Sequence, residues 1–168
     1  PDILLIISIE EINMKIQDSY KMVIAAEIRA QKMYAALAKS FAQPETQNLY
    51  TELVMLEQNH ETKMRAAFAR LFPGEILVLP EEKIGELKGI DLSDPQKVLE
   101  FAISREELAE GIYKSMAETC LDADLKQLLL QFAHEEDEHK SILLAEIQRL
   151  QGAHVWFDPS ELNGLMED

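Results

Sequence analysis

The chain has 168 residues, of which 47% are hydrophobic, and this is enough to build one domain with a substantial core. A formal net charge of −15 argues against nucleic acid and anionic membrane surfaces as partners, because both attract basic surfaces. The single cysteine excludes an intrachain disulfide and a thiolate cluster for zinc or an iron–sulfur centre, and it fits a cytoplasmic protein. We therefore expect residues 1–168 to form a single domain.

Four long helices are predicted in chain order from apolar residues at helical spacing and from helix-ending residues. Pro44 and Pro95 suit the first position of a helix and mark two of the starts. Ser8 opens a capping box and offers the first helix an alternative start to Asn13. The expected ranges are about 13–41, 44–72, 95–120 and, after a turn at 122–124, up to 151.

The three connections between these helices are short, long and short, because residues 73–94 show no helical period. This pattern is typical of an all-α, ferritin-like four-helix bundle with one long crossover between the second and third helices. The bundle would occupy about residues 13–151, and we expect the tail, 152–168, to dock on its outside through Trp156. The apolar run at 3–7 is too short to span a membrane, so it is expected to pack on the bundle or on a partner subunit.

Two Glu-x-x-His units occur within the predicted helices, and they are Glu57 with His60 and Glu136 with His139. Residues three apart share one face of a helix, so each carboxylate and its imidazole can reach the same point. The two units are 79 residues apart (136 − 57), and further residues repeat at this offset. Among them are the pairs Glu27 with Glu106 and Tyr34 with Tyr113. A register kept without a gap across two helices and their turn indicates an internal duplication.

The positions of the repeated residues predict that they meet at one level of the bundle. Glu27 lies 14 residues before the end of its helix (41 − 27), and Glu57 lies 13 residues after the next helix starts (57 − 44). Both are therefore roughly 20 Å from the turn, and the second half repeats this arrangement. Four carboxylates buried at one level are costly without cations, so we interpret the cluster as a site for two divalent metal ions. The alternative is a set of surface carboxylates with incidental histidines.

Tyr34 and Tyr113 each follow their glutamate by seven residues, which places them on the same helical stripe. We expect each phenol to cross the bundle and hydrogen-bond a ligand carboxylate, the alternative being ordinary aromatic packing. Glu110 lies one turn after Glu106 and is either an extra ligand or an exposed charge. The other nearby acidic and histidine side chains are expected to be solvated or structural, and they are Glu107, Glu135, Glu138, His134 and His154.

The combined pattern resembles the di-iron domain of rubrerythrins, within the ferritin-like superfamily, over about residues 13–151. The residues that carry the resemblance are Glu27, Tyr34, Glu57, His60, Glu106, Tyr113, Glu136 and His139. It implies two iron ions bridged by Glu57 and Glu136, with Glu27 and Glu106 as terminal ligands and one histidine on each iron. It also implies a diferrous site that reduces hydrogen peroxide to water. Because the two halves carry the same ligands, the two metal positions are expected to be nearly equivalent.

Two features depart from the rubrerythrin pattern. The chain lacks the four cysteines of a rubredoxin domain, so electrons would come from a separate donor protein. Ala109 stands where rubrerythrins carry an additional glutamate. Bacterioferritins share the symmetric ligand set, so the alternative function is iron binding and storage through ferroxidase chemistry with oxygen. The same ligand types also accept manganese or zinc, and a dimanganese site with catalase activity is a third interpretation. We expect a homodimer, whereas a storage protein would form a large cage.

Overall fold

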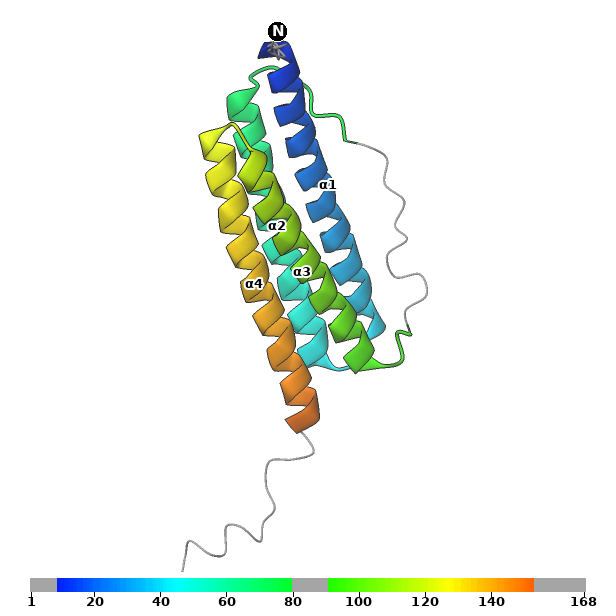
Figure 1. The fold of residues 1–168 in the computed structure, drawn as a ribbon. Coiled ribbons are helices and arrows are strands. Elements are labelled where there is room, and N and C mark those ends of the chain that lie inside the picture. The colour runs from blue at the N-terminus through cyan, green and yellow to red at the C-terminus, as the bar shows by residue number, and fades with distance from the viewer. Residues whose placement is uncertain (1–8, 80–90, 153–168) are drawn as a thin grey trace, which may run out of the picture.

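The computed structural model describes residues 9–79 and 91–152, and within these ranges all regular secondary structure is helical. The helices are α1 (Ile9–Ser40), α2 (Pro44–Leu71), α3 (Pro95–Thr119) and α4 (Ala123–Gly152). They lie side by side in an elongated bundle (Figure 1), which confirms the predicted all-α, ferritin-like class. The apolar run at 3–7 and the tail that carries Trp156 lie outside the described residues.

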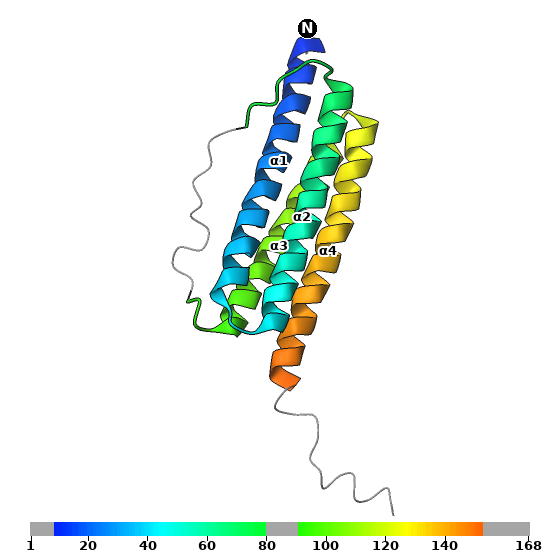
Figure 2. The ribbon, with the colours of Figure 1, turned by 180° about the vertical axis from the view of Figure 1, so that it is seen from behind.

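The chain order produces two antiparallel hairpins. Helices α1 and α2 pack closely against each other, α3 and α4 do the same, and α2 also contacts α4. Helices α2 and α3 run in the same direction, so the end of α2 and the start of α3 lie at opposite ends of the bundle (Figures 1 and 2). The connection between these two helices therefore spans the length of the bundle, as the predicted long crossover requires.

The helix ends follow from local residues. Proline occupies the first turn of both α2 and α3, and Asp94 caps α3 by accepting hydrogen bonds from two backbone N–H groups of its first turn. After α2, Gly74 adopts a φ of +87°, a left-handed conformation that favours glycine. The predicted boundaries agree with these helices to within one or two residues, except that α1 starts at Ile9, next to the alternative start at Ser8.

Buried apolar side chains form two clusters, one on each side of a buried polar layer. The first cluster lies toward the start of α1 and includes Tyr20, Phe68 and Leu129. The second lies toward the turn between α1 and α2 and includes Leu53 and Leu99. The buried glutamates and histidines occupy the level between the two clusters. Buried apolar side chains therefore pack on both sides of this polar layer. Within the described ranges, each helix is too short or too polar to cross a membrane.

Candidate metal centre

The six repeated glutamate and histidine side chains come together in the polar layer of the bundle. Helix α1 supplies Glu27, α3 supplies Glu106, and α2 and α4 each supply one Glu-x-x-His unit. All six side chains are buried, with relative exposures of 1 to 3%, and they are Glu27, Glu57, His60, Glu106, Glu136 and His139. The structure thus places every predicted ligand at one level, and each hairpin contributes three of them.

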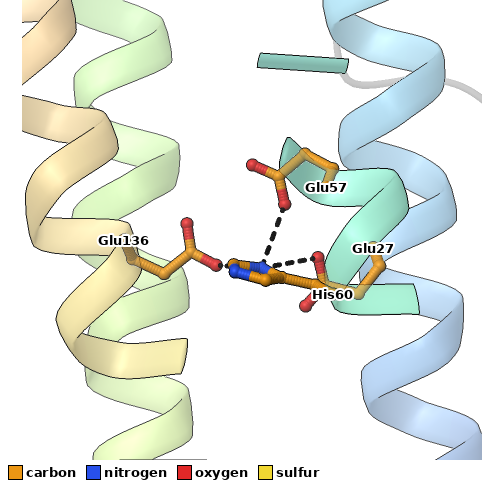
Figure 3. A group of neighbouring side chains, drawn as sticks. All are labelled: Glu27, Glu57, His60 and Glu136. Atoms are coloured by element: carbon orange, nitrogen blue, oxygen red, sulfur yellow. Dashed lines mark ion pairs between the residues drawn. The ribbon is translucent and has the colours of Figure 1, made fainter. Parts of the chain in front are cut away.

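The six side chains form two overlapping groups of possible metal ligands. The first group consists of Glu27, Glu57, His60 and Glu136 (Figure 3). The second consists of Glu57, Glu106, Glu136 and His139. Within each group, one possible ligand atom per residue lies within 4.8 Å of every other. Glu57 and Glu136 belong to both groups, so they are placed where they could bridge two ions, and each remaining glutamate and histidine belongs to one group.

In each group a histidine Nδ1 atom faces three carboxylates. His60 Nδ1 lies 3.5 Å from Glu27 Oε2, 3.6 Å from Glu57 Oε2 and 3.3 Å from Glu136 Oε1. In the second group, His139 Nδ1 lies 3.2 Å from Glu57, 3.4 Å from Glu106 and 3.0 Å from Glu136. A single N–H hydrogen cannot bond to three carboxylates at once. Some of the buried carboxylate oxygens are therefore left without a hydrogen-bond donor.

The atoms left over are those that a metal would bind. Among the described residues, Glu57 Oε1, His60 Nδ1 and Glu136 Oε1 are buried without a hydrogen bond. Burying such groups unpartnered costs free energy, and coordination to a cation removes that cost. Four carboxylates and two imidazoles are ligand types that divalent iron, manganese and zinc accept. The residues present therefore fit a pair of divalent metal ions.

The electrostatics of the cluster divide its carboxylates into two kinds. Burial raises the pKa of Glu27 to about 8 and raises the pKa of Glu106 well above its ordinary value. Burial acts the same way on Glu57 and Glu136, but hydrogen bonds from the two histidines outweigh it and lower the pKa of both. Near neutral pH and without metal, the bridging pair is therefore ionised and the terminal pair is protonated.

The two histidines balance the ionised pair. Burial by itself lowers the pKa of each imidazole, but the three carboxylates that face each ring raise the pKa of His60 and of His139 to about 12. Both rings are then cationic near neutral pH in the absence of metal. Two imidazolium ions and two carboxylates give the buried cluster no net charge, which is how the protein tolerates so many titratable groups at one level.

Two tyrosines contact the terminal carboxylates from across the bundle. Tyr34 on α1 donates a hydrogen bond to Glu106 Oε1, and Tyr113 on α3 donates one to Glu27 Oε1. Burial and the neighbouring Glu27 charge raise the pKa of Tyr113 well above its ordinary value, so its phenol remains a donor. Each tyrosine thus joins the two hairpins and fixes the rotamer of a carboxylate in the opposite one.

Other side chains near the cluster lie outside the two ligand groups. Glu110 forms ion pairs with Lys114 and with Lys140, whose Nζ lies 3.4 Å from Glu110 Oε2. Glu110 therefore belongs to an ion-pair network and not to the two ligand groups. His134 is exposed and lies 3.6 Å from Glu138, away from the buried cluster. His154 lies outside the described residues.

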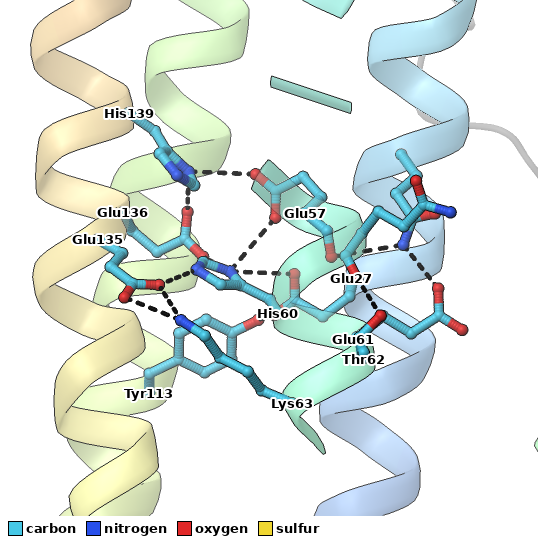
Figure 4. Close-up of polar contacts among 12 residues, drawn as sticks. Glu27, Glu57, His60, Glu61, Thr62, Lys63, Tyr113, Glu135, Glu136 and His139 are labelled. Carbon is cyan, nitrogen blue, oxygen red and sulfur yellow. Dashed lines mark hydrogen bonds and ion pairs between the residues drawn. The ribbon is translucent and has the colours of Figure 1, made fainter. Parts of the chain in front are cut away.

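One hydrogen bond to the cluster was not predicted from the sequence. Glu135, expected to be solvated, accepts a hydrogen bond from His60 Nε2 at 2.6 Å, and its carboxylate also binds Lys63 (Figure 4). That expectation was wrong because the residue before Glu136 points sideways along the bundle, toward α2. The relevant signal was its position next to a ligand, but the sequence does not reveal which helix lies beside α4.

A small cavity reaches the cluster between α1 and α3. Its volume is about 70 Å³, which suits a molecule of a few atoms. All four candidate carboxylate ligands line it, together with Ala26, Ala30, Ala109, Met33 and Ile112 and with Arg29 and Arg105. Ala109, where rubrerythrins carry an additional glutamate, thus contributes a methyl group to the cavity wall.

Comparisons with known proteins agree with this geometry. A family model described as Rubrerythrin matches residues 20–88 and 97–163, a span that contains all six candidate ligands and both tyrosines. Among solved structures, a hypothetical protein from Pyrococcus furiosus is 27% identical, with a TM-score of 0.67. That match covers 83% of this chain and 92% of the other. No curated protein shows significant sequence similarity to the chain.

Proposed function

Because the chain belongs to the rubrerythrin family, we propose that it is a di-iron oxidoreductase that reduces hydrogen peroxide with electrons from a separate donor protein. The observation that carries the proposal is the pair of buried, overlapping ligand groups that share Glu57 and Glu136. Family membership supports a di-iron protein, and the donor set fits two divalent ions.

Each residue of the cluster has a role in this proposal. Glu57 and Glu136 would bridge the two ions, Glu27 with His60 would hold one, and Glu106 with His139 would hold the other. When bound, two ferrous ions would supply the two electrons that, together with two protons, reduce one hydrogen peroxide molecule to two waters. Tyr34 and Tyr113 hold the terminal carboxylates by hydrogen bonds, so those ligands keep one orientation.

The surroundings of the cluster support a small, neutral substrate. Apolar clusters pack against the polar layer on both sides, and a cavity between α1 and α3 opens next to it. Apart from the four carboxylates, alanine, methionine, leucine and isoleucine side chains line this cavity together with Tyr113 and two arginines. Such a lining favours hydrogen peroxide over a hydrated Fe²⁺ ion, which a ferroxidase would have to admit repeatedly.

The proposal predicts that peroxide oxidises the iron-loaded, reduced protein much faster than oxygen does. Hydrogen peroxide should be consumed at about one molecule per two irons, because two ferrous ions together provide two electrons. Stopped-flow spectroscopy of the anaerobic, diferrous protein mixed with either oxidant measures both the rates and the stoichiometry. Oxidation by oxygen at the same rate, followed by accumulation of an iron mineral, would contradict the peroxidase and favour the storage function.

The size of the assembly provides a second test. We propose a homodimer in the cytoplasm, with a mass near twice the 19.1 kDa of one chain. Light scattering of the purified protein at several concentrations measures this mass directly. A large cage would instead support the ferroxidase alternative, because mineral storage needs an enclosed volume.

A further inference from the structure

Two residues of α4, Phe132 and Glu135, hold the His60 ring on the side away from the four buried carboxylates. Its Nδ1 atom faces the ligand group, and its Nε2 atom donates a hydrogen bond of 2.6 Å to Glu135 Oε2 (Figure 4). The ring of Phe132 stacks on the imidazole with 4.2 Å between ring centroids. One edge and one face of the ring are thus fixed by α4, and only Nδ1 points into the cluster.

Glu135 is itself held in place. Lys63 Nζ lies 3.1 and 3.2 Å from its two carboxylate oxygens, and Gln131 donates a hydrogen bond of 2.7 Å to Oε1. The side chain is 23% exposed, so these contacts are only partly screened by solvent. Lys63 also offsets the charge of Glu135, so a carboxylate can be kept next to the acidic cluster. The result is a chain of contacts from Lys63 through Glu135 to the His60 ring.

The second half of the duplicated chain lacks this arrangement. At the 79-residue offset, Leu56 corresponds to Glu135 and Ile142 corresponds to Lys63. Neither a leucine nor an isoleucine side chain can hydrogen-bond His139. The six candidate ligands therefore repeat, but the support behind the two histidines does not. This differs from the near equivalence of the two metal positions that the ligand pattern predicts.

We infer that Glu135, held by Lys63, is a positioning residue for His60 and makes the Glu27–His60 position the tighter of two metal positions, so that two divalent ions bind in order. A carboxylate that accepts the Nε2 hydrogen fixes the tautomer whose Nδ1 lone pair faces the metal, and it makes the ring a stronger donor. At His139 neither effect is available from the corresponding position. The inference rests on the proposed metal centre and is independent of the reaction with peroxide.

The test is a titration of the metal-free, full-length protein with Co²⁺, in which calorimetry and visible absorption measure the binding. Wild type should bind two ions with separate affinities. Glu135→Leu introduces the residue type found at the corresponding position 56. It should lower the affinity for the first ion by about 10–100-fold, the usual effect of losing a hydrogen-bond partner of a metal-binding histidine. The second affinity should change little, so the two binding steps should merge. Glu135→Gln keeps an acceptor oxygen and should recover part of the loss.

A spectroscopic readout assigns the tighter position. With one Co²⁺ per chain, wild type should show one paramagnetically shifted imidazole N–H proton that exchanges slowly, because Glu135 accepts that hydrogen. Glu135→Leu should lose this signal. The matched control is Glu138→Leu, which removes the same charge from a 63% exposed side chain of α4 and should leave both affinities and the signal unchanged.

The outcomes separate this inference from the proposed function. Two equal affinities in wild type, an unchanged first affinity in Glu135→Leu, or an equal loss in Glu138→Leu would overturn the inference and leave the metal centre standing. If circular dichroism shows that Glu135→Leu does not fold, Glu135→Gln carries the test, and a first affinity equal to that of wild type overturns the inference. Failure of wild type to bind two Co²⁺ ions would contradict the metal centre itself.

Discussion

Replacing Glu57 and Glu136 together by glutamine is expected to reduce the bound divalent metal from about two ions per chain to none. Both side chains belong to both ligand groups, and an amide oxygen without charge is a much weaker ligand for a divalent ion. Glutamine keeps the size of the side chain, so the packing of the polar layer should survive. Metal analysis of protein expressed with iron measures the result, and circular dichroism checks that the variant remains helical.

The control for this variant is a second double substitution on the same two helices. Glu52→Gln with Glu138→Gln removes two exposed charges from α2 and α4 and changes the net charge by the same amount. It should retain both ions, because neither side chain belongs to the buried cluster. Retention of two ions by the Glu57 and Glu136 variant would show that the metal binds elsewhere and would refute the assigned ligands.

Binding of two divalent ions at pH 7 is expected to release about four protons from the protein. Before metal binds, the pKa of about 12 keeps His60 and His139 protonated, and raised pKa values keep Glu27 and Glu106 mostly protonated. All four groups must lose a proton to become ligands. Four positive charges on the metals then replace four protons, so the buried layer keeps its overall neutrality.

The sign of the pH dependence follows from this exchange. Lower pH favours the protonated ligands, so the apparent metal affinity should fall as the pH is lowered from 8 to 6. Calorimetric titration in buffers with different ionisation enthalpies gives the number of protons released per metal. The Glu57→Gln and Glu136→Gln variant, which binds no metal, should release none. Release of fewer than two protons by wild type would mean that the histidines are not cationic before metal binds.

The sequence predicted much of the fold because most of it depends on local rules. Prolines after the first and second connections of the chain marked the starts of α2 and α3, and distances along the helices brought six candidate ligands to one level. The Glu135 contact could not be predicted in the same way. It depends on α2 lying beside α4, and a helix repeat does not specify which neighbours meet sideways. Glu110 was ambiguous for a similar reason, since Lys140, one of its two ion-pair partners, lies on another helix.

The division of the ligands between the hairpins has a consequence for how the two halves of the chain are coupled. Each hairpin contributes three of the six candidate ligands, so a bound metal pair would crosslink the two hairpins in addition to the two apolar clusters that they share. The peptide connection between α2 and α3 carries none of the six and serves as a tether. The shared apolar clusters and the two tyrosine hydrogen bonds therefore align the hairpins around the candidate ligands, and a bound metal pair would add a direct link between them.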